Sequence, residues 1–222
     1  MPKTEYPFIL AGEPRTGTPR TIRCPYDGSE AGIAHFAGAM DLEEATVQAV
    51  KAAPAMARLP PYERAEILRR IAGGIAMRAE ELTRVMALEA AKPIRQARIE
   101  VGRSQSIFAA AAEEAVRIPA EVIPMETSPA GLGRQAILRR FPLGPIAAIT
   151  PFNFPLNQVA HKLAPAIAAG CSLVLKPASQ TPLSALMLAE IARESGLPGG
   201  GLSLLPLSAD LAAPLAEDER FR

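Results

Sequence analysis

PFNFPL (residues 151–156) and AAGCSLVLKPASQTP (residues 168–182) are the two stretches that decide the fold. A short apolar run leads into the proline-containing turn of each stretch, residues 145–150 in the first and 172–175 in the second. Short apolar runs bounded by turn residues are typical of buried strands. Both turns are therefore expected directly after a strand.

A helix is expected after each turn. Apolar residues recur at helical spacing from about residue 156 to 169, and Gly170 is placed as a C-terminal stop. The second helix is expected to open with Thr181 as its cap and Pro182 at its first position. A further apolar run covers residues 202–205. This alternation favours an α/β fold with a doubly wound, mainly parallel sheet that binds ligands at the carboxyl ends of its strands.

The two turns resemble motifs of the aldehyde dehydrogenase superfamily, in which a Pro-Phe/Trp-Asn-Phe-Pro turn and a Lys-Pro-Ala/Ser-x-x-Thr-Pro turn sit at the mouth of the nicotinamide dinucleotide site. Weaker resemblance extends to LEAAKP (88–93) and FPLGP (141–145). The chain is therefore identified as a member of that superfamily. The resemblance implies a Rossmann-like fold without the G-x-G-x-x-G fingerprint, and GLG (131–133) is indeed too short a match for that fingerprint.

The resemblance implies a catalytic role for Asn153. Its side-chain amide would point at the aldehyde oxygen and stabilise the oxyanion that forms when a cysteine thiolate adds to the carbonyl. The alternative is that Asn153 only shapes a turn between two prolines. The surrounding motif favours the donor role.

The resemblance also implies a set of cofactor-binding residues. Lys176 resembles the lysine that contacts the cofactor ribose, although a lysine at a strand end is often simply solvated. Ser179 stands where many members carry a glutamate that would repel a 2′-phosphate, so NAD or NADP is expected, with a preference for NADP, unless Ser179 is only a solvated loop residue. LSADLAA (207–213) replaces the Gly-x-x-x-Gly of many members, which leaves part of the pyrophosphate contact in doubt. The expected cofactor-binding positions are Thr150, Pro151, Phe152, Asn153, Lys176, Ala178 and Ser179.

Helical spacing of apolar residues predicts three helices in the first half of the chain. Asp41 with Glu44 is expected to form a capping box for the first helix. The second is expected from residue 62 to about residue 89, with a weak point at residues 73–74, and a third follows. The resemblance implies a substrate role for Arg103 on the third helix, because the corresponding helix of the family can reach the substrate tunnel and an arginine there suits an anionic aldehyde. A solvated arginine on the helix face is the alternative.

Three segments are expected from pattern and resemblance together. Residues 1–117 form an amino-terminal arm and the helical part of the cofactor-binding domain. Residues 118–143 read as two strands and, by resemblance, form an oligomerisation hairpin, so a homodimer or homotetramer is expected. Residues 144–222 hold the first βαβ units of the NAD(P)-binding domain.

The resemblance places the nucleophilic cysteine, the catalytic glutamate and the catalytic domain outside this sequence. Cys24 and Cys171 have no His or Lys partner at suitable spacing, so neither is expected to replace the nucleophile. We therefore expect the cofactor-side portion of an NAD(P)-dependent aldehyde dehydrogenase, inactive alone. The alternatives are a non-catalytic dinucleotide-binding or subunit-interaction module and, with less support, another nucleotide-dependent enzyme on a doubly wound sheet.

The composition favours a cytoplasmic protein. The 222 residues carry a formal net charge of +1, which gives no general attraction to nucleic acid or membrane. The amino terminus lacks a signal-peptide pattern, and no apolar run is long enough to span a bilayer. Two cysteines and two histidines without paired spacing do not predict a metal site.

Overall fold

The computed structural model describes residues 4–222 and has a five-stranded mixed sheet at its centre. The strands of this sheet are β2 (Phe8–Leu10), β3 (Glu13–Arg15), β8 (Ile146–Ile149), β9 (Leu173–Lys176) and β10 (Leu202–Leu204). Their order is β3-β2-β10-β9-β8, in which β8, β9 and β10 run parallel and β2 adds antiparallel to β10. The expected mainly parallel sheet is confirmed, with an antiparallel extension from the amino terminus.

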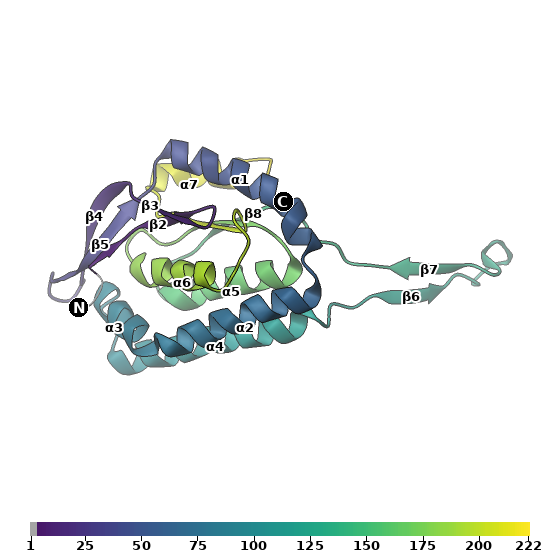
Figure 1. Ribbon diagram of the computed structural model, residues 1–222, viewed down its shortest axis with the longest axis horizontal. Helices are drawn as coiled ribbons and strands as arrows, with labels where there is room; N and C mark the ends of the chain where they lie inside the picture. Colours follow the sequence, from purple (N-terminus) through teal and green to yellow (C-terminus); the bar gives the residue numbers. More distant parts are fainter. Residues whose placement is uncertain (1–3) are drawn as a thin grey trace.

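Helices cover both faces of this sheet (Figure 1). They are α1 (Ala39–Arg58), α2 (Pro61–Met77), α3 (Ala79–Glu89), α4 (Ile94–Ala115), α5 (Pro155–Ala169), α6 (Leu183–Glu194) and α7 (Ala212–Glu217). α1 and α7 lie on one face and α5 and α6 on the other, with α2 and α4 packed outside α5 and α6. The doubly wound architecture is confirmed. None of the helices within residues 4–222 combines the length and apolar character needed to cross a bilayer.

The register of β8 and β9 brings the two motif turns together. Ile149 at the end of β8 pairs with Lys176 at the end of β9. The Thr150 amide continues the ladder by donating to the Lys176 carbonyl at 3.1 Å. Gly170 ends α5 with φ 81°, the left-handed conformation that glycine adopts at low cost. Both turns therefore leave the sheet side by side at its carboxyl edge.

The helix expected over residues 62–89 is in fact two helices. The break falls at Arg78, between α2 and α3, and not at the Gly73-Gly74 pair. A Cβ atom on Gly74 would lie 2.5 Å from Cγ2 of Ile191, so this glycine is needed where α2 approaches α6. At the break, the Arg78 guanidinium donates to Glu81 at 2.9 Å and to Glu190 of α6 at 2.8 Å. The close approach of α2 and α6 explains Gly74, and the break at Arg78 coincides with an ion pair to Glu190 on another helix.

The capping box predicted at Asp41 and Glu44 was placed three residues late, because the N-cap is Gly38 and not Asp41. α1 begins at Ala39 with Gly38 as its N-cap, and the Asp41 carboxylate accepts the Gly38 amide at 2.8 Å. Asp41 is thus the third helical residue and not the cap. Glu44 instead forms a paired ion contact with Arg15 of β3, at 2.7 Å.

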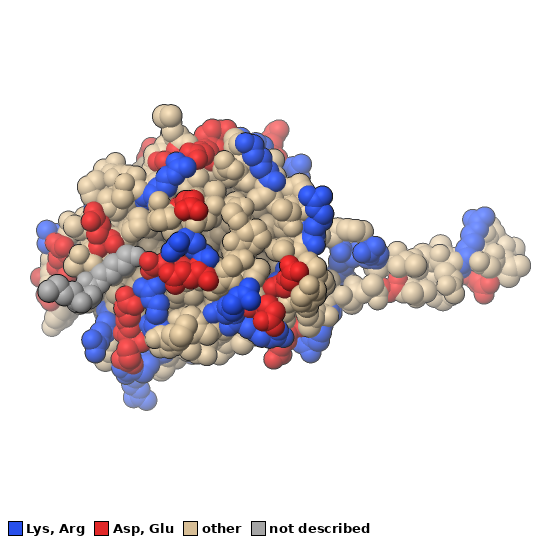
Figure 2. All heavy atoms as spheres, in the orientation of Figure 1, with Lys and Arg blue, Asp and Glu red and all other residues tan. Residues whose placement is uncertain are grey.

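Two smaller sheets flank the main body. One has the order β1-β5-β4, formed by β1 (Glu5–Tyr6), β4 (Thr18–Arg23) and β5 (Glu30–Phe36). The other is the antiparallel hairpin of β6 (Glu121–Pro124) and β7 (Gln135–Leu138), with the short 3-10 turn η1 (Pro129–Gly131) near its tip. The hairpin extends away from the rest of the molecule in Figure 1. Figure 2 shows few charged side chains along it and mixed charges on the main body.

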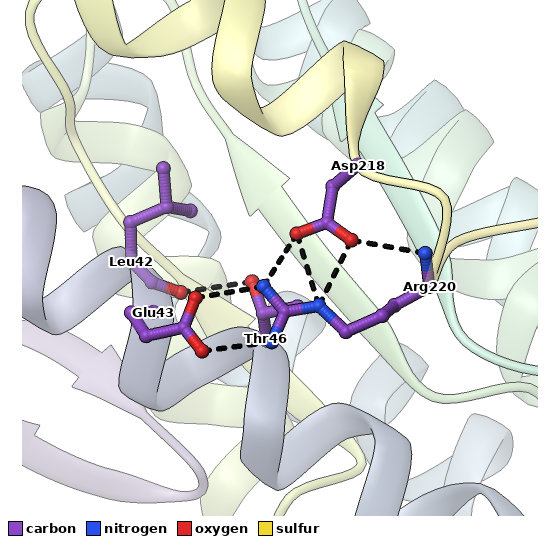
Figure 3. Close-up of polar contacts among 5 residues, drawn as sticks. All are labelled: Leu42, Glu43, Thr46, Asp218 and Arg220. Atoms are coloured by element: carbon purple, nitrogen blue, oxygen red, sulfur yellow. Dashed lines mark hydrogen bonds and ion pairs between the residues drawn. The ribbon is translucent and has the colours of Figure 1, made fainter.

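The carboxyl-terminal segment is fastened to α1 (Figure 3). The Arg220 guanidinium donates to Glu43 of α1 at 2.7 Å and 2.8 Å and to Asp218 beyond α7 at 2.6 Å. The Arg222 amide donates to the Pro145 carbonyl at 3.1 Å, just before β8. This segment, with η2 (Ala209–Leu211) before α7, therefore runs beside the start of β8.

Candidate active site

A cavity of about 610 Å³ lies where the two motif turns leave the sheet. Phe152 and Asn153 of the β8 turn line it together with Ser179 of the β9 turn. The remaining wall comes from the end of β4 and the loop after it, and from the connection between α3 and α4, including Glu89 and Lys92. Of the expected cofactor-binding residues, Phe152, Asn153 and Ser179 line this cavity, whereas Thr150, Pro151, Lys176 and Ala178 are not among its lining residues. Glu89 and Lys92 were not predicted at the site.

The β8 turn presents Asn153 to solvent. Its side chain is exposed and has no hydrogen-bond partner among residues 4–222, so its amide is free to meet a ligand. Phe152 beside it is 57% exposed. Thr150, at the base of the turn, is buried, and its hydroxyl has no partner within the described chain. Buried hydroxyls are normally hydrogen-bonded, so the unpaired Thr150 hydroxyl is an exception at the base of this turn.

The β9 turn holds Lys176 and Ser179 close together. Lys176 is only 6% exposed, and its Nζ lies 3.4 Å from the Ser179 hydroxyl and 3.5 Å from the Pro177 carbonyl. These distances are at the long limit of hydrogen bonding, and burial lowers the pKa of Lys176. The Ser179 hydroxyl donates to the Leu207 carbonyl at 2.9 Å. Neither residue is the freely solvated side chain that the sequence left as an alternative.

A buried carboxylate on α4 holds the beginning of α5. Glu100 is 2% exposed, and its Oε1 accepts the amides of Leu156 and Asn157 at 3.1 Å each. Its Oε2 pairs with the Lys92 ammonium, which also donates to the Asn153 carbonyl at 3.0 Å. The partial positive charge of a helix N-terminus favours such a carboxylate.

A second buried carboxylate, at the end of α3, holds the beginning of α6. Glu89 accepts the amides of Leu183 and Ser184 at 2.6 Å and 3.1 Å, and also the Ser184 hydroxyl. The expected cap, Thr181, does not do this, because α6 begins after Pro182 and the buried Thr181 hydroxyl has no partner in the described chain. Burial raises the pKa of Glu89 to about 7, with the nearby Glu100 charge adding to the effect.

Both carboxylates carried a signal in the sequence. Glu100 occupies a buried position of α4 together with Ala97, Val101 and Ser104, where an unpaired charge would be costly. Glu89 belongs to the LEAAKP stretch, which had been noted only for its resemblance. The helical spacing of these acids among apolar residues could have indicated that each needs a partner, although it was not interpreted in this way. It could not indicate which helix would supply that partner.

The structure does not bring Arg103 to the cavity. Arg103 is exposed on α4 and is not among the lining residues, so its role stays a prediction. Cys24 and Cys171 are 7% and 2% exposed, and neither lines the cavity. Within residues 4–222, no group of three or more His, Cys, Asp or Glu side chains is arranged to hold a metal ion.

Sequence comparison finds the aldehyde dehydrogenase family model matching residues 13–222. One similar protein is the 3-sulfolactaldehyde dehydrogenase of Priestia aryabhattai, 49% identical over 65% of this chain and 30% of its own length. The NADP-dependent succinate-semialdehyde dehydrogenase of Escherichia coli is 40% identical over 83% of this chain and 38% of its own length. The chain therefore spans well under half of the length of these relatives.

Solved structures of aldehyde dehydrogenases have the same fold as this chain. Aldehyde dehydrogenase 21 from Physcomitrella patens, in complex with the reaction product succinate, has a TM-score of 0.96 at 43% identity, covering 100% of this chain and 47% of its own. The NADP-dependent glyceraldehyde-3-phosphate dehydrogenase of Bacillus halodurans, complexed with NADP, has a TM-score of 0.93 at 28% identity, covering 99% of this chain and 47% of its own. The resemblance carried by the two turns is confirmed: this chain belongs to the aldehyde dehydrogenase family.

Proposed function

We propose that the protein containing this sequence oxidises an aldehyde to a carboxylic acid with NAD or NADP, through a cysteine thiohemiacetal, and that this chain supplies the cofactor side of the site. The observation that carries the proposal is the convergence of Asn153 and Ser179 on one cavity at the ends of adjacent parallel strands. In doubly wound sheets such a crevice is the usual ligand position. The segment 144–222 is then the first part of the cofactor-binding domain.

Asn153 is the oxyanion donor in this proposal. Its amide is exposed at the cavity and unpaired within the described chain, while its own carbonyl is held by Lys92. A donor that needs no rearrangement stabilises charge that develops in the transition state more than it stabilises the substrate. The amide therefore lowers the barrier to thiolate addition.

The crevice is suited to a dinucleotide. Thr181 lines the cavity, and its buried hydroxyl has no partner within residues 4–222, so it can turn to bond a ligand there; the Thr150 hydroxyl also has no partner, but Thr150 is not among the lining residues. Lys176, with the hydroxyl of Ser179, would hold ribose or phosphate oxygens, and the backbone of Pro151, Phe152 and Ala178 would line the groove. A bound nicotinamide cofactor supplies the hydride acceptor.

NADP is the preferred cofactor in this proposal. The turn KPASQTP (176–182) contains no acidic residue, so nothing in it repels a 2′-phosphate. Lys176 lies 3.4 Å from Ser179 and has no carboxylate partner within the described chain, so its charge is available to a phosphate. The NADP-dependent Escherichia coli relative is consistent with this preference, whereas a similar solved structure from Sinorhizobium meliloti is named as NAD-dependent.

The substrate in this proposal is a short anionic aldehyde. The relatives named for 3-sulfolactaldehyde and for succinate semialdehyde act on aldehydes that carry an acidic group. Arg103, which is exposed on α4 and does not line the cavity, is the partner proposed for that group. The β6–β7 hairpin is proposed to join subunits into a homodimer or homotetramer, because Val122 and Ile137 are 64% and 70% exposed on it.

The test is an NADP- and NAD-dependent assay of the protein that contains this sequence, on a panel of short aldehydes with and without an acidic group. The purified protein's intact mass is measured in parallel. Asn153→Ala should lower kcat by about a hundredfold or more while changing cofactor affinity little. Unchanged turnover in the variant would remove Asn153 from the mechanism. Cofactor binding without turnover in the wild type would favour a non-catalytic binding module instead.

A further inference from the structure

The turn that carries Asn153 has little support of its own. Residues 151–154 belong to neither strand nor helix, and the Asn153 side chain has no partner within the described chain. Phe154, the residue at the N-cap position of α5, offers no side-chain oxygen to the first amides of the helix. A preorganised donor needs a fixed backbone. The groups that fix this backbone come from another part of the chain.

Lys92 contacts the turn on both sides of the Asn153–Phe154 peptide bond. Its Nζ donates to the Asn153 carbonyl at 3.0 Å and lies 4.3 Å from the centroid of the Phe154 ring. The Lys92 side chain is 14% exposed, so both contacts are shielded from most of the solvent. An ammonium in this position binds an oxygen and an aromatic face at once. It therefore limits where the peptide can move.

Glu100 fixes Lys92 and α5 with one carboxylate. Oε2 pairs with Lys92, while Oε1 accepts the amides of Leu156 and Asn157. Pro155, the first residue of α5, has no amide hydrogen, so these are the first two donors of the helix. Glu100 thus caps the N-terminus of α5 from another helix, although it lies 56 residues before Leu156 in the sequence.

We propose that Lys92 and Glu100 are a positioning pair that holds the Asn153 amide where the oxyanion forms. The inference rests on the proposed function, because it assigns the pair a role in the same reaction. Although Lys92 also lines the cavity, the role proposed for the pair is to fix the peptide from which the donor side chain projects. Displacement of a catalytic group by about 1 Å can cost on the order of a hundredfold in rate. The pair therefore acts on kcat through Asn153.

The first test measures the turn itself and needs no activity. Hydrogen–deuterium exchange is followed in peptides that cover residues 152–158, for the wild type, Lys92→Met and Glu100→Gln. Both variants should exchange faster there, since Glu100→Gln leaves Lys92 without its charge partner and Lys92→Met removes the donor to Asn153. Arg98→Met is the matched control, because it breaks an exposed ion pair between α4 and α3, with Glu80 at 3.0 Å. Equal exchange in the wild type and the pair variants would overturn the inference.

The second test is a double-mutant cycle on turnover. Lys92→Met should lower kcat by about tenfold or more, with a change in the cofactor dissociation constant of less than about twofold. In an Asn153→Ala background the same substitution should change kcat by less than about twofold, because the group it positions is already gone. Arg98→Met should leave kcat unchanged in both backgrounds.

The outcomes separate the two proposals. A wild-type protein without aldehyde turnover contradicts the proposed function, and the exchange experiment then decides whether the pair holds the turn. Turnover in the wild type with equal losses from Lys92→Met in both backgrounds overturns the positioning role and leaves the proposed function standing. A loss confined to the background that retains Asn153 supports both.

Discussion

Replacing Glu89 by glutamine reveals how burial of a carboxylate at the start of α6 links stability to pH. Burial raises the pKa of Glu89 from 4.5 to about 7, although bonds from Ser184 and Leu183 favour the ionised form. Between these two values the folded protein retains a proton that the unfolded chain has released. The free energy of unfolding therefore falls as the pH rises through this window, and the stabilising contribution is complete only below the lower value.

The magnitude follows from the width of that window. At 1.36 kcal/mol per pH unit, the interval from 4.5 to about 7 corresponds to about 3 kcal/mol. Glutamine does not titrate, so the difference in unfolding free energy between wild type and Glu89→Gln should fall by about that amount from acidic to neutral pH. Glutamine also replaces one acceptor by an amino group facing the Leu183 or Ser184 amide. That change adds an offset of about 1–3 kcal/mol that does not vary with pH.

The assay is urea unfolding of both proteins at intervals across this pH range. Glu66→Gln serves as the control, because Glu66 lies on the surface of α2 in an exposed pair with Arg69. The difference in unfolding free energy between this control and the wild type, measured at each pH, gives the baseline for removal of an exposed acid. Parallel pH profiles for the wild type and Glu89→Gln, within about 0.5 kcal/mol, would refute the argument that burial dominates at this carboxylate.

Two further substitutions test the proposed cofactor and assembly. Ser179→Glu places a carboxylate beside Lys176 and should lower kcat/KM for NADP relative to NAD by about tenfold or more; an unchanged ratio would exclude this turn from cofactor selection. Val122→Lys combined with Ile137→Glu places an opposite-charge pair at two directly opposite, exposed positions of the hairpin and should reduce the molar mass in solution, measured by light scattering, while the hairpin stays paired. An unchanged molar mass would contradict the hairpin's role.

The region from β8 to β10 could be predicted to within a few residues. Its strands are short apolar runs that end near prolines, and α5 ends at a glycine in the left-handed conformation. Each of these signals lies in the sequence of the element that it predicts, so no distant contact is needed to read it. The residues of the two turns were also assigned to one edge of the sheet, since parallel strands place their carboxyl ends together. The register of Ile149 with Lys176 confirms that arrangement.

The features that were missed depend on partners far away in the sequence. Ile9 of β2 pairs with Leu204 of β10, and nothing near either residue indicates this contact. The break at Arg78 coincides with a bond to Glu190 on another helix. Burial of Lys176 likewise depends on distant contacts: the solvated alternative was open at a strand end, but the residue is 6% exposed once the turns and the segment after β10 pack around it. Local sequence patterns therefore predict which helices and strands form, whereas contacts with distant residues determine where those elements begin and end.

The segment from the end of α3 to the first half of α4 contacts the helix that follows each of the two motif turns. Glu89 binds the start of α6, which follows the β9 turn, while Glu100 and Lys92 bind the start of α5 and the turn after β8. In the proposed reaction, hydride transfer needs cofactor and aldehyde at a fixed separation, so the two turns would have to keep a constant position relative to each other. The parallel pairing of β8 and β9 fixes the relative position of the strand ends, but within the described chain it makes no hydrogen bonds to the turn residues beyond Thr150. The segment from Glu89 to Glu100 contacts the starts of both helices, and in the proposed mechanism it supplies that constraint.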